Sequence, residues 1–308
     1  MFFLLPLVCT AYFIDLFISI NLKKSNSYAQ GEYTTWNDIY NGKINSDLII
    51  NGSSRAWVEI DPTMIGDSLH TTAYNIGIDG YSFPMQYLRH SLLMEYNPRP
   101  KLIIHSVDFF TFFVREDLYN YEQFLPYMLF NKEMRCATIG YKGFNLIDYE
   151  LPLVRYYGKL DVMQTALGLF LNPQDNELKR VKGYEPQNML WGTDFEQVKK
   201  EMNTYSVKID SATVLLFERY LQECKTNGIK IILVYTPEYI EGQKFVKNRD
   251  EVIQIFTTFS RKYDVPFYDF SKDSMSFQTK YFFNSMHLNK TGAELFTNKL
   301  IKKIKEIQ

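Results

Sequence analysis

The sequence predicts an α/β fold, a three-layer α/β/α sandwich around a parallel sheet, with a helical insertion and one N-terminal membrane helix. Short β-forming runs alternate with segments of helical period, which is the pattern of a parallel sheet covered by helices on both faces. The run 229–235 is continuously apolar, as in a strand buried on both sides. Residues 1–21 are almost wholly apolar, and about 20 such residues can cross a bilayer.

The N-terminal segment 1–22 predicts an uncleaved signal-anchor. Asp15 is its single charge, and no small-residue cleavage site closes the run. Lys23 and Lys24 follow it, and the positive-inside rule would keep that side cytoplasmic. We nevertheless expect a membrane-anchored protein whose main domain is extracytoplasmic, and a buried core helix is the alternative. A linker is expected at 23–46, before a domain at 47–308.

The first half of that domain contains three short apolar runs, which predict strands at 47–51, 72–76 and 101–105. A helix is expected over 82–95, and Pro98 ends it. The chain thus passes from strand to helix to strand, as a parallel sheet requires.

The second half repeats this order after a long interruption. Helical period returns at 211–227, behind a cap at Asp210 or Ser211 and before Gly228. Two strands and two helices complete the fold, at 229–235, 249–263, 265–270 and from Asn289 to the end. The expected sheet is flavodoxin-like.

Residues from about 110 to 205 break the rhythm. They are rich in Tyr, Phe and Leu, with helical patches and turn clusters, and they contain no clean strand. An insertion of this kind between two strand–helix units is expected to form a cap over the carboxyl edge of the sheet.

Composition limits the partners and cofactors. The formal net charge is −1, and the basic run 299–305 reads as the exposed face of a terminal helix, so we predict no nucleic-acid partner. Cys9, Cys136 and Cys224 lack the spacing of zinc ligands, and no phosphate-binding loop is present. We therefore predict no metal and no cofactor. Aromatic residues reach 16%, which can line an acyl or carbohydrate cleft, although core packing is the simpler reading.

Chemically active residues are expected at one edge of the predicted sheet. Asn51-Gly-Ser-Ser-Arg55 follows the first strand directly, and His287 precedes the last helix. Open α/β sheets build their sites at the carboxyl ends of strands. A serine there, with a histidine to accept its proton, is the pair used for nucleophilic acyl transfer. His105 also ends a strand and is the rival base.

These residues resemble the SGNH/GDSL hydrolase superfamily over about 47–108 and 229–308. Its first block, Gly-Asp-Ser, is similar to Gly52-Ser53-Ser54, which makes Ser54 the nucleophile and puts Ser53 in place of the usual aspartate. The segment Asn75-Ile-Gly-Ile-Asp-Gly80 is similar to the second block. The resemblance implies an oxyanion hole from the N–H groups of Ser54 and Gly80, with Gly80 preferred to Gly77.

Two other blocks depart from the family pattern. Asn284-Ser-Met-His287 stands where the family has Asp-x-x-His, so the base is present and the acid is an amide. The family's third-block asparagine is missing from His105-Ser-Val-Asp108. The run His287-Leu-Asn-Lys-Thr-Gly is similar to the membrane-anchored branch linked to acylation of bacterial surface polysaccharides.

That branch implies a serine esterase or O-acyltransferase that acts on cell-surface carbohydrate through an acyl-Ser54 intermediate. It also implies a membrane-bound acyltransferase as partner. Hydrolysis and transfer share this intermediate, so the sequence leaves both open.

The amide at Asn284 leaves three alternatives, because it cannot stabilise an imidazolium as a carboxylate does. In the first, Asp108 or Asp269, both near strand ends, supplies the acid. In the second, Ser54 and the histidine act as a pair without an acid. In the third, the domain is an inactive pseudo-hydrolase that binds polysaccharide as an accessory of an acylation or export complex. Arg55 is expected to hold an anionic or sugar substrate, to pair with Asp108 or to form a structural ion pair.

A second Gly-Asp-Ser-Leu sequence lies at 66–69. No strand is expected before it, since 60–65 is interrupted by Pro62, whereas a nucleophile elbow needs strand, turn and helix in that order. We therefore expect Ser68 in a surface segment and prefer Ser54 as the nucleophile.

Overall fold

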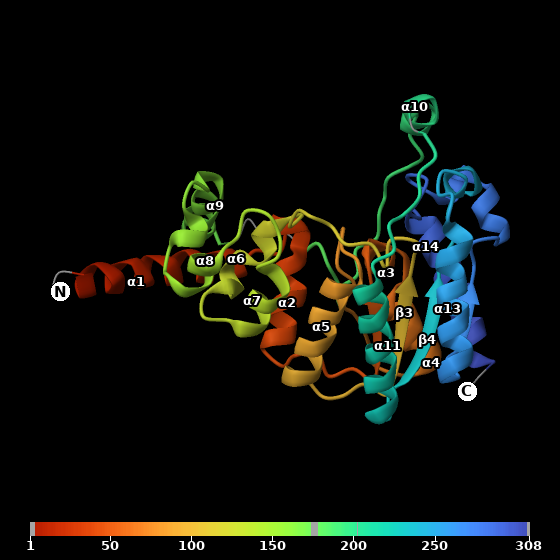
Figure 1. Ribbon diagram of the computed structural model, residues 1–308, viewed down its shortest axis with the longest axis horizontal. Helices are drawn as coiled ribbons and strands as arrows, with labels where there is room; N and C mark the ends of the chain where they lie inside the picture. The colour runs from red at the N-terminus through yellow and green to blue at the C-terminus, as the bar shows by residue number, and fades with distance from the viewer. Residues whose placement is uncertain (1–3, 174–177, 202, 307–308) are drawn as a thin grey trace. The chain divides into compact units, whose positions relative to one another are not determined.

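The computed structural model describes residues 4–173, 178–201 and 203–306, which form two compact units (Figure 1). Unit 1 combines Met1–Asn41 with Arg115–Val181, and unit 2 combines Gly42–Val114 with Lys182–Gln308. The predicted insertion is therefore divided between the two units near residue 181.

Unit 2 is built on a five-stranded parallel sheet of order β2-β1-β3-β4-β5. This is the flavodoxin-like order, and the predicted fold class is confirmed. Each strand overlaps a predicted one: β1 (Leu48–Gly52), β2 (Ala73–Asn75), β3 (Leu102–Val107), β4 (Lys230–Tyr235) and β5 (Phe267–Asp269).

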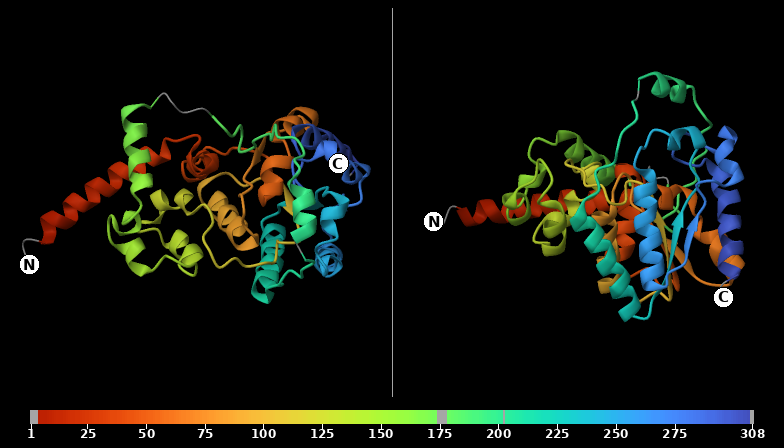
Figure 2. Two further views of the ribbon diagram at one scale, coloured as in Figure 1. Left: turned by 90° about the horizontal axis from the view of Figure 1, so that it is seen from above. Right: turned by 45° about the vertical axis from the view of Figure 1, so that its right-hand side comes forward.

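Helices cover both faces of this sheet because strand side chains alternate in direction. Ile50, Ile104 and Val234 belong to one apolar core with α3 (Ser54–Glu59), α4 (Pro62–Leu69) and α14 (Lys290–Lys305). The opposite face holds α5 (Phe83–Tyr96), α11 (Ser211–Thr226) and α13 (Arg249–Tyr263). In the right-hand view of Figure 2, α11 and α13 lie on one side of the strands and α14 on the other.

The segment 60–69 differs from its prediction. Asp61 accepts hydrogen bonds from the N–H groups of Thr63 and Met64, and Pro62 occupies the first turn, where a proline loses no hydrogen bond. A helix therefore forms where a proline-broken stretch was expected. Ser68 lies half-buried in its last turn and not on a strand-to-helix elbow.

Residues 182–201 and 203–210 of unit 2, which we call the edge segment, contact the rest of this unit near the carboxyl side of the sheet, while α10 projects away from it (Figure 1). Lys182 O accepts the N–H of Asn75 at 2.9 Å, and Gln187 O accepts the N–H of Lys290 at 2.7 Å. The segment contains α10 (Asp194–Glu201) and then pairs with the residues after α12 (Ile240–Gln243). It therefore covers the end of β2 and the start of α14.

Unit 1 is helical. Its bounds are α1 (Leu4–Lys23), η1 (Tyr28–Gly31), α2 (Glu32–Tyr40), η2 (Tyr121–Gln123), α6 (Leu125–Met128), α7 (Lys132–Thr138), α8 (Leu146–Glu150), η3 (Val154–Tyr156) and α9 (Leu160–Leu171). The predicted linker at 23–46 thus contains a helix, α2. Within α1, the stretch Leu5–Lys23 has a mean hydropathy of 1.7 and is long and apolar enough to span a membrane or act as a signal-anchor.

Candidate active site

The turn from β1 to α3 places Ser54 at the carboxyl end of the sheet. Gly52 has φ +147°, and a Cβ there would lie 2.6 Å from the carbonyl oxygen of Ser106 on β3, so only glycine fits. Ser53 then caps α3 by accepting the N–H of Arg55 at 3.3 Å. Ser54 begins the helix, and its N–H has no acceptor among the described residues. That N–H is free to face an oxyanion.

His287 meets Ser54 from a loop 233 residues further along the chain. The distance from Ser54 Oγ to His287 Nε2 is 2.8 Å. An antiparallel bridge between Phe282 and Leu288 closes the loop, and Phe283 donates its N–H to His287 O at 3.1 Å. The Phe283 ring stacks on the imidazole at 5.4 Å, which fixes the plane of the base.

The side chain of Asn284 orients this imidazole. Its Oδ1 accepts the N–H groups of Met286 and His287, both at 2.9 Å, and lies 3.1 Å from His287 Nδ1. Since an oxygen can only accept, Nδ1 carries the proton and Nε2 presents its lone pair to the Ser54 hydroxyl. The amide thus sets the tautomer that a general base needs, without adding a negative charge.

The electrostatic surroundings disfavour a charged imidazole. Desolvation, and after it the positive charge of Arg55, lowers the pKa of His287 from 6.5 to about 3. The ring is therefore neutral at pH 7 and able to accept a proton. It is also a weaker base than a histidine paired with a carboxylate.

The predicted alternative acids lie elsewhere. Asp108 Oδ2 accepts the Ser53 hydroxyl at 2.6 Å, and its Oδ1 accepts the N–H of Phe110 at 2.7 Å. Asp269 accepts the N–H of Ser271 at 2.9 Å at the exposed end of β5. Within the described part of the chain, neither carboxylate is bonded to His287. Asp108 instead holds the residue before the nucleophile.

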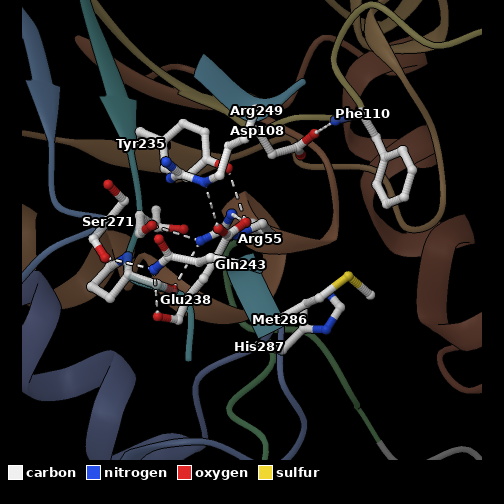
Figure 3. A network of polar contacts seen from close by, with 12 residues as sticks. Arg55, Asp108, Phe110, Tyr235, Glu238, Gln243, Arg249, Ser271, Met286 and His287 are labelled. Carbon is white, nitrogen blue, oxygen red and sulfur yellow. Dashed lines mark hydrogen bonds and ion pairs between the residues drawn. The ribbon is translucent and has the colours of Figure 1, made fainter. Parts of the chain in front are cut away.

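Arg55 is turned into the protein, and the prediction that it binds substrate does not agree with this placement. Its side chain is 4% exposed, it forms an ion pair with Glu238, and it donates to the carbonyl oxygens of Thr236 at 2.6 Å and Pro237 at 2.8 Å. Figure 3 shows the Arg55 side chain with Glu238, and His287 in the same region. Arg55 therefore ties α3 to the loop after β4.

Two buried glutamates of this region escaped the sequence analysis. Glu59 Oε1 accepts the N–H of Leu288 at 3.2 Å, which links α3 to the residue after the base. Burial raises its pKa to about 7 against the lowering effect of Arg55. Glu238 accepts the Tyr235 hydroxyl at 3.0 Å. For Glu238 the sequence did contain a signal, because a charged residue stands three positions after the apolar strand β4, at the edge of the sheet where sites are built.

His105 and Gly80 are the other two predicted residues of the site. His105 is fully buried, with Nε2 3.1 Å from Gln86 Oε1 and Nδ1 3.3 Å from the Tyr220 hydroxyl, so the rival base lies in an aromatic core. Gly80 lies in the turn after β2, and in the same loop Ile78 donates its N–H to Gly52 O at 3.0 Å. This bond holds the predicted second oxyanion segment beside the nucleophile turn.

Comparisons with known proteins give structural likeness only. No family model matches the chain, and no curated protein matches it. Solved structures similar to it include an acetyl xylan esterase, with TM-score 0.43, 12% identity and coverage of 83% of this chain and 98% of that one. A GDSL-like lipase from Bacteroides thetaiotaomicron has TM-score 0.34, 12% identity and coverage of 83% and 88%. The assignment of the site therefore rests on this chain's own side chains.

Proposed function

We propose that this protein is a serine O-acyl esterase or O-acyltransferase of the SGNH type. The observation that carries the proposal is the 2.8 Å contact between Ser54 Oγ and a neutral His287 Nε2. A hydroxyl at this distance from an unprotonated imidazole can transfer its proton as it attacks a carbonyl carbon.

The reaction would proceed through an acyl-enzyme. Ser54 Oγ attacks the acyl carbon while His287 Nε2 takes the hydroxyl proton, and the N–H groups of Ser54 and Gly80 hold the oxyanion. The ester C–O bond then breaks, and the proton passes from the imidazole to the departing alcohol. Water or a sugar hydroxyl attacks the acyl-serine by the same steps in reverse, which regenerates Ser54 and releases an acid or a new ester.

The substrate class follows from the resemblance of the segment 287–292 to the branch that acylates bacterial surface polysaccharides. We therefore propose an acylated carbohydrate as substrate and a membrane-bound acyltransferase as partner. Helix α1 supports a membrane-anchored protein, and the catalytic unit is proposed to be extracytoplasmic.

A polysaccharide-binding pseudo-hydrolase is the second candidate, and one observation favours it. Asn284 gives His287 no negative charge, and the pKa of the imidazole is about 3. A base this weak activates a hydroxyl less well than a carboxylate-paired histidine does. An accessory protein would need a glycan-binding surface but no proton transfer.

Fluorophosphonate labelling of the full-length protein in detergent separates the two candidates, since the reagent reports an activated serine. We expect labelling in the wild type and in Ser68→Ala, and its loss in Ser54→Ala. Loss in Ser68→Ala alone would move the nucleophile to α4. A wild type that stays unlabelled would favour the binding protein, and glycan binding would then be measured.

A further inference from the structure

Unit 1 exposes a large apolar surface on three helices. Most of the exposed large hydrophobic side chains in the described part of the chain belong to this unit. On α8 they are Leu146, Ile147 and neighbouring Leu151, and on α9 they are Leu160, Leu167, Phe170 and Leu171. Along α1 they extend from Leu5 to Ile20. Soluble proteins rarely leave contiguous patches of this kind uncovered.

In the second half of helix α1 the polar side chains are covered. Asp15, Ser19 and Asn21 are buried, whereas Phe13, Leu16 and Ile20 are exposed. The covered face packs against residues of α6, η3 and α9 within the same unit. From Phe13 to Ile20 the exposed side of α1 is thus apolar, and its charge is held inside unit 1.

The charge of Asp15 is neutralised by a residue far along the chain. Arg155 donates two hydrogen bonds of 2.7 Å to the two carboxylate oxygens, and both side chains are at most 3% exposed. The Ser19 hydroxyl lies 3.4 Å from the Asp15 carboxylate, and the N–H of Leu153 donates to the same carboxylate at 2.7 Å. Ionisable residues inside a membrane are expensive and pair with a partner at the same depth.

This pair constrains how α1 can enter a bilayer. Asp15 lies inside the stretch Leu5–Lys23 that is apolar enough to span. If that stretch enters the hydrocarbon, Arg155 enters with it, because separating the two would leave a buried charge unpaired at a cost of several kcal/mol. Helix α9 follows η3 directly and contacts α1 through the rings of Phe170 and Phe17, whose centroids are 5.1 Å apart.

We propose that the outer faces of α1, α8 and α9 form one lipid-facing surface, by which unit 1 is embedded in a membrane leaflet. Helix α9 has 12 residues and so a length of about 18 Å, which is too short for the ~30 Å hydrocarbon core but matches one leaflet. The occupant is lipid hydrocarbon, since this surface continues the face of a helix with the hydropathy of a membrane span. The inference does not depend on catalysis by Ser54.

Fluorescence of a dye on one exposed cysteine in the full chain tests the contact, with Cys224 left in place because it is buried. Cys9 and Cys136, both exposed, are replaced by serine, and an environment-sensitive dye is attached at Phe170→Cys. The matched position is Leu215→Cys, because Leu215 is 65% exposed on α11 of unit 2 and Phe170 is 53% exposed on α9. The protein is reconstituted in vesicles of phosphatidylethanolamine and phosphatidylglycerol with nitroxide-labelled acyl chains.

We expect a blue shift and nitroxide quenching for the dye at position 170 and neither for the dye at position 215. A dye at 170 that stays in water while the protein floats with the vesicles would overturn the proposal and leave α1 as a lone anchor. A dye protected only in native membranes would overturn the lipid assignment and indicate a protein partner.

A charge on the surface provides a second readout. Leu167→Glu with Leu171→Glu should lower the nitroxide quenching of the dye at position 170 at least three-fold, whereas Leu215→Glu should leave that quenching unchanged. Circular dichroism checks that each variant is folded. Unchanged quenching in the folded double variant would contradict a lipid-facing α9.

Discussion

The carbonyl oxygen of Asn284 does half of what an aspartate would do at that position. It accepts three N–H groups, including the 3.1 Å contact with His287 Nδ1, and so fixes both the loop and the tautomer of the base. It supplies no charge to stabilise the imidazolium that forms as Ser54 loses its proton. Orientation is retained, and electrostatic support is reduced.

Restoring the acid should therefore activate the site. In Asn284→Asp we expect a higher pKa of His287 and a higher kcat/KM for an aryl ester, by up to the ~10⁴-fold that the reverse change removes in a serine protease triad. The acidic limb of the pH–rate profile should move to higher pH, because the imidazole then protonates more readily. Steady-state kinetics from about pH 3, where His287 of the wild type titrates, to about pH 9 provides the measurement.

Two control variants separate charge from orientation. Asn227→Asp adds the same charge at an exposed position after α11 and should leave the profile unchanged. Asn284→Ala removes the acceptor and should lower the rate. An Asn284→Asp variant with the wild-type rate and profile would show that this position does not act through His287.

At this scale the sequence predicted the residues that carry a motif and missed those that depend on distant contacts. Ser54 was chosen because it follows a strand and begins a helix, and His287 because it stands in a motif similar to Asp-x-x-His before the last helix. A structural ion pair was one of the three roles expected for Arg55, but its partner was not identified, since Glu238 lies 183 residues away and no local pattern relates the two. Buried ion pairs are specified by packing, which a single sequence does not display.

Among the elements, α14 determines where the base is held. Asn289 caps the helix by accepting the N–H of Gly292 at 3.0 Å, and its amide donates to the carbonyl oxygen of Lys280 at 2.8 Å. A Cβ at Gly292 would stand 2.1 Å from the carbonyl oxygen of Tyr281. The start of the helix and the loop that carries His287 are thus in backbone contact.

Gly292→Ala should move this helix start away from Tyr281 and displace His287 from Ser54. We expect labelling of Ser54 by fluorophosphonate to slow at least ten-fold, together with a loss of stability of about 1–3 kcal/mol from overpacking. Gly168→Ala is the matched control, since Gly168 also lies in a helix and a Cβ there meets nothing within 4 Å. Equal labelling rates in the two variants would contradict the coupling.

Elements with a clear period were predicted well, and those stabilised by capping or by long-range packing were not. The strands and α5, α11, α13 and α14 follow from apolar runs of period two or 3.6. Helix α4 was missed because Pro62 was read as a break, although proline is favoured in a first turn behind a capping aspartate. The contacts of residues 115–181 with the N-terminal helices have no local signature at all.

For the whole molecule, buried histidines and a buried glutamate should have opposite effects on the free energy of unfolding as the pH falls. Burial lowers the pKa of His90 to about 4 and of His105 to about 3, whereas it raises the pKa of Glu59 to about 7. A histidine with a depressed pKa loses stability as the pH falls below its unfolded value of about 6.5. A glutamate with a raised pKa gains stability over the same range, because the folded state binds the proton first.

From pH 6.5 to pH 5 these two histidines and His287, whose pKa is also lowered to about 3, should together lower the free energy of unfolding by about 5 kcal/mol, and protonation of Glu59 should offset about 2 kcal/mol of that loss. Glu59→Gln removes the offset, so its unfolding free energy should fall roughly one and a half times as steeply as that of the wild type. Urea unfolding followed by the fluorescence of Trp57 and Trp191, in a Trp36→Phe background, reports unit 2.

The exposed Glu251→Gln variant should retain the wild-type slope. A Glu59→Gln slope equal to that of the wild type would mean that Glu59 is already ionised in the folded protein, and Arg55 would then hold two buried carboxylates.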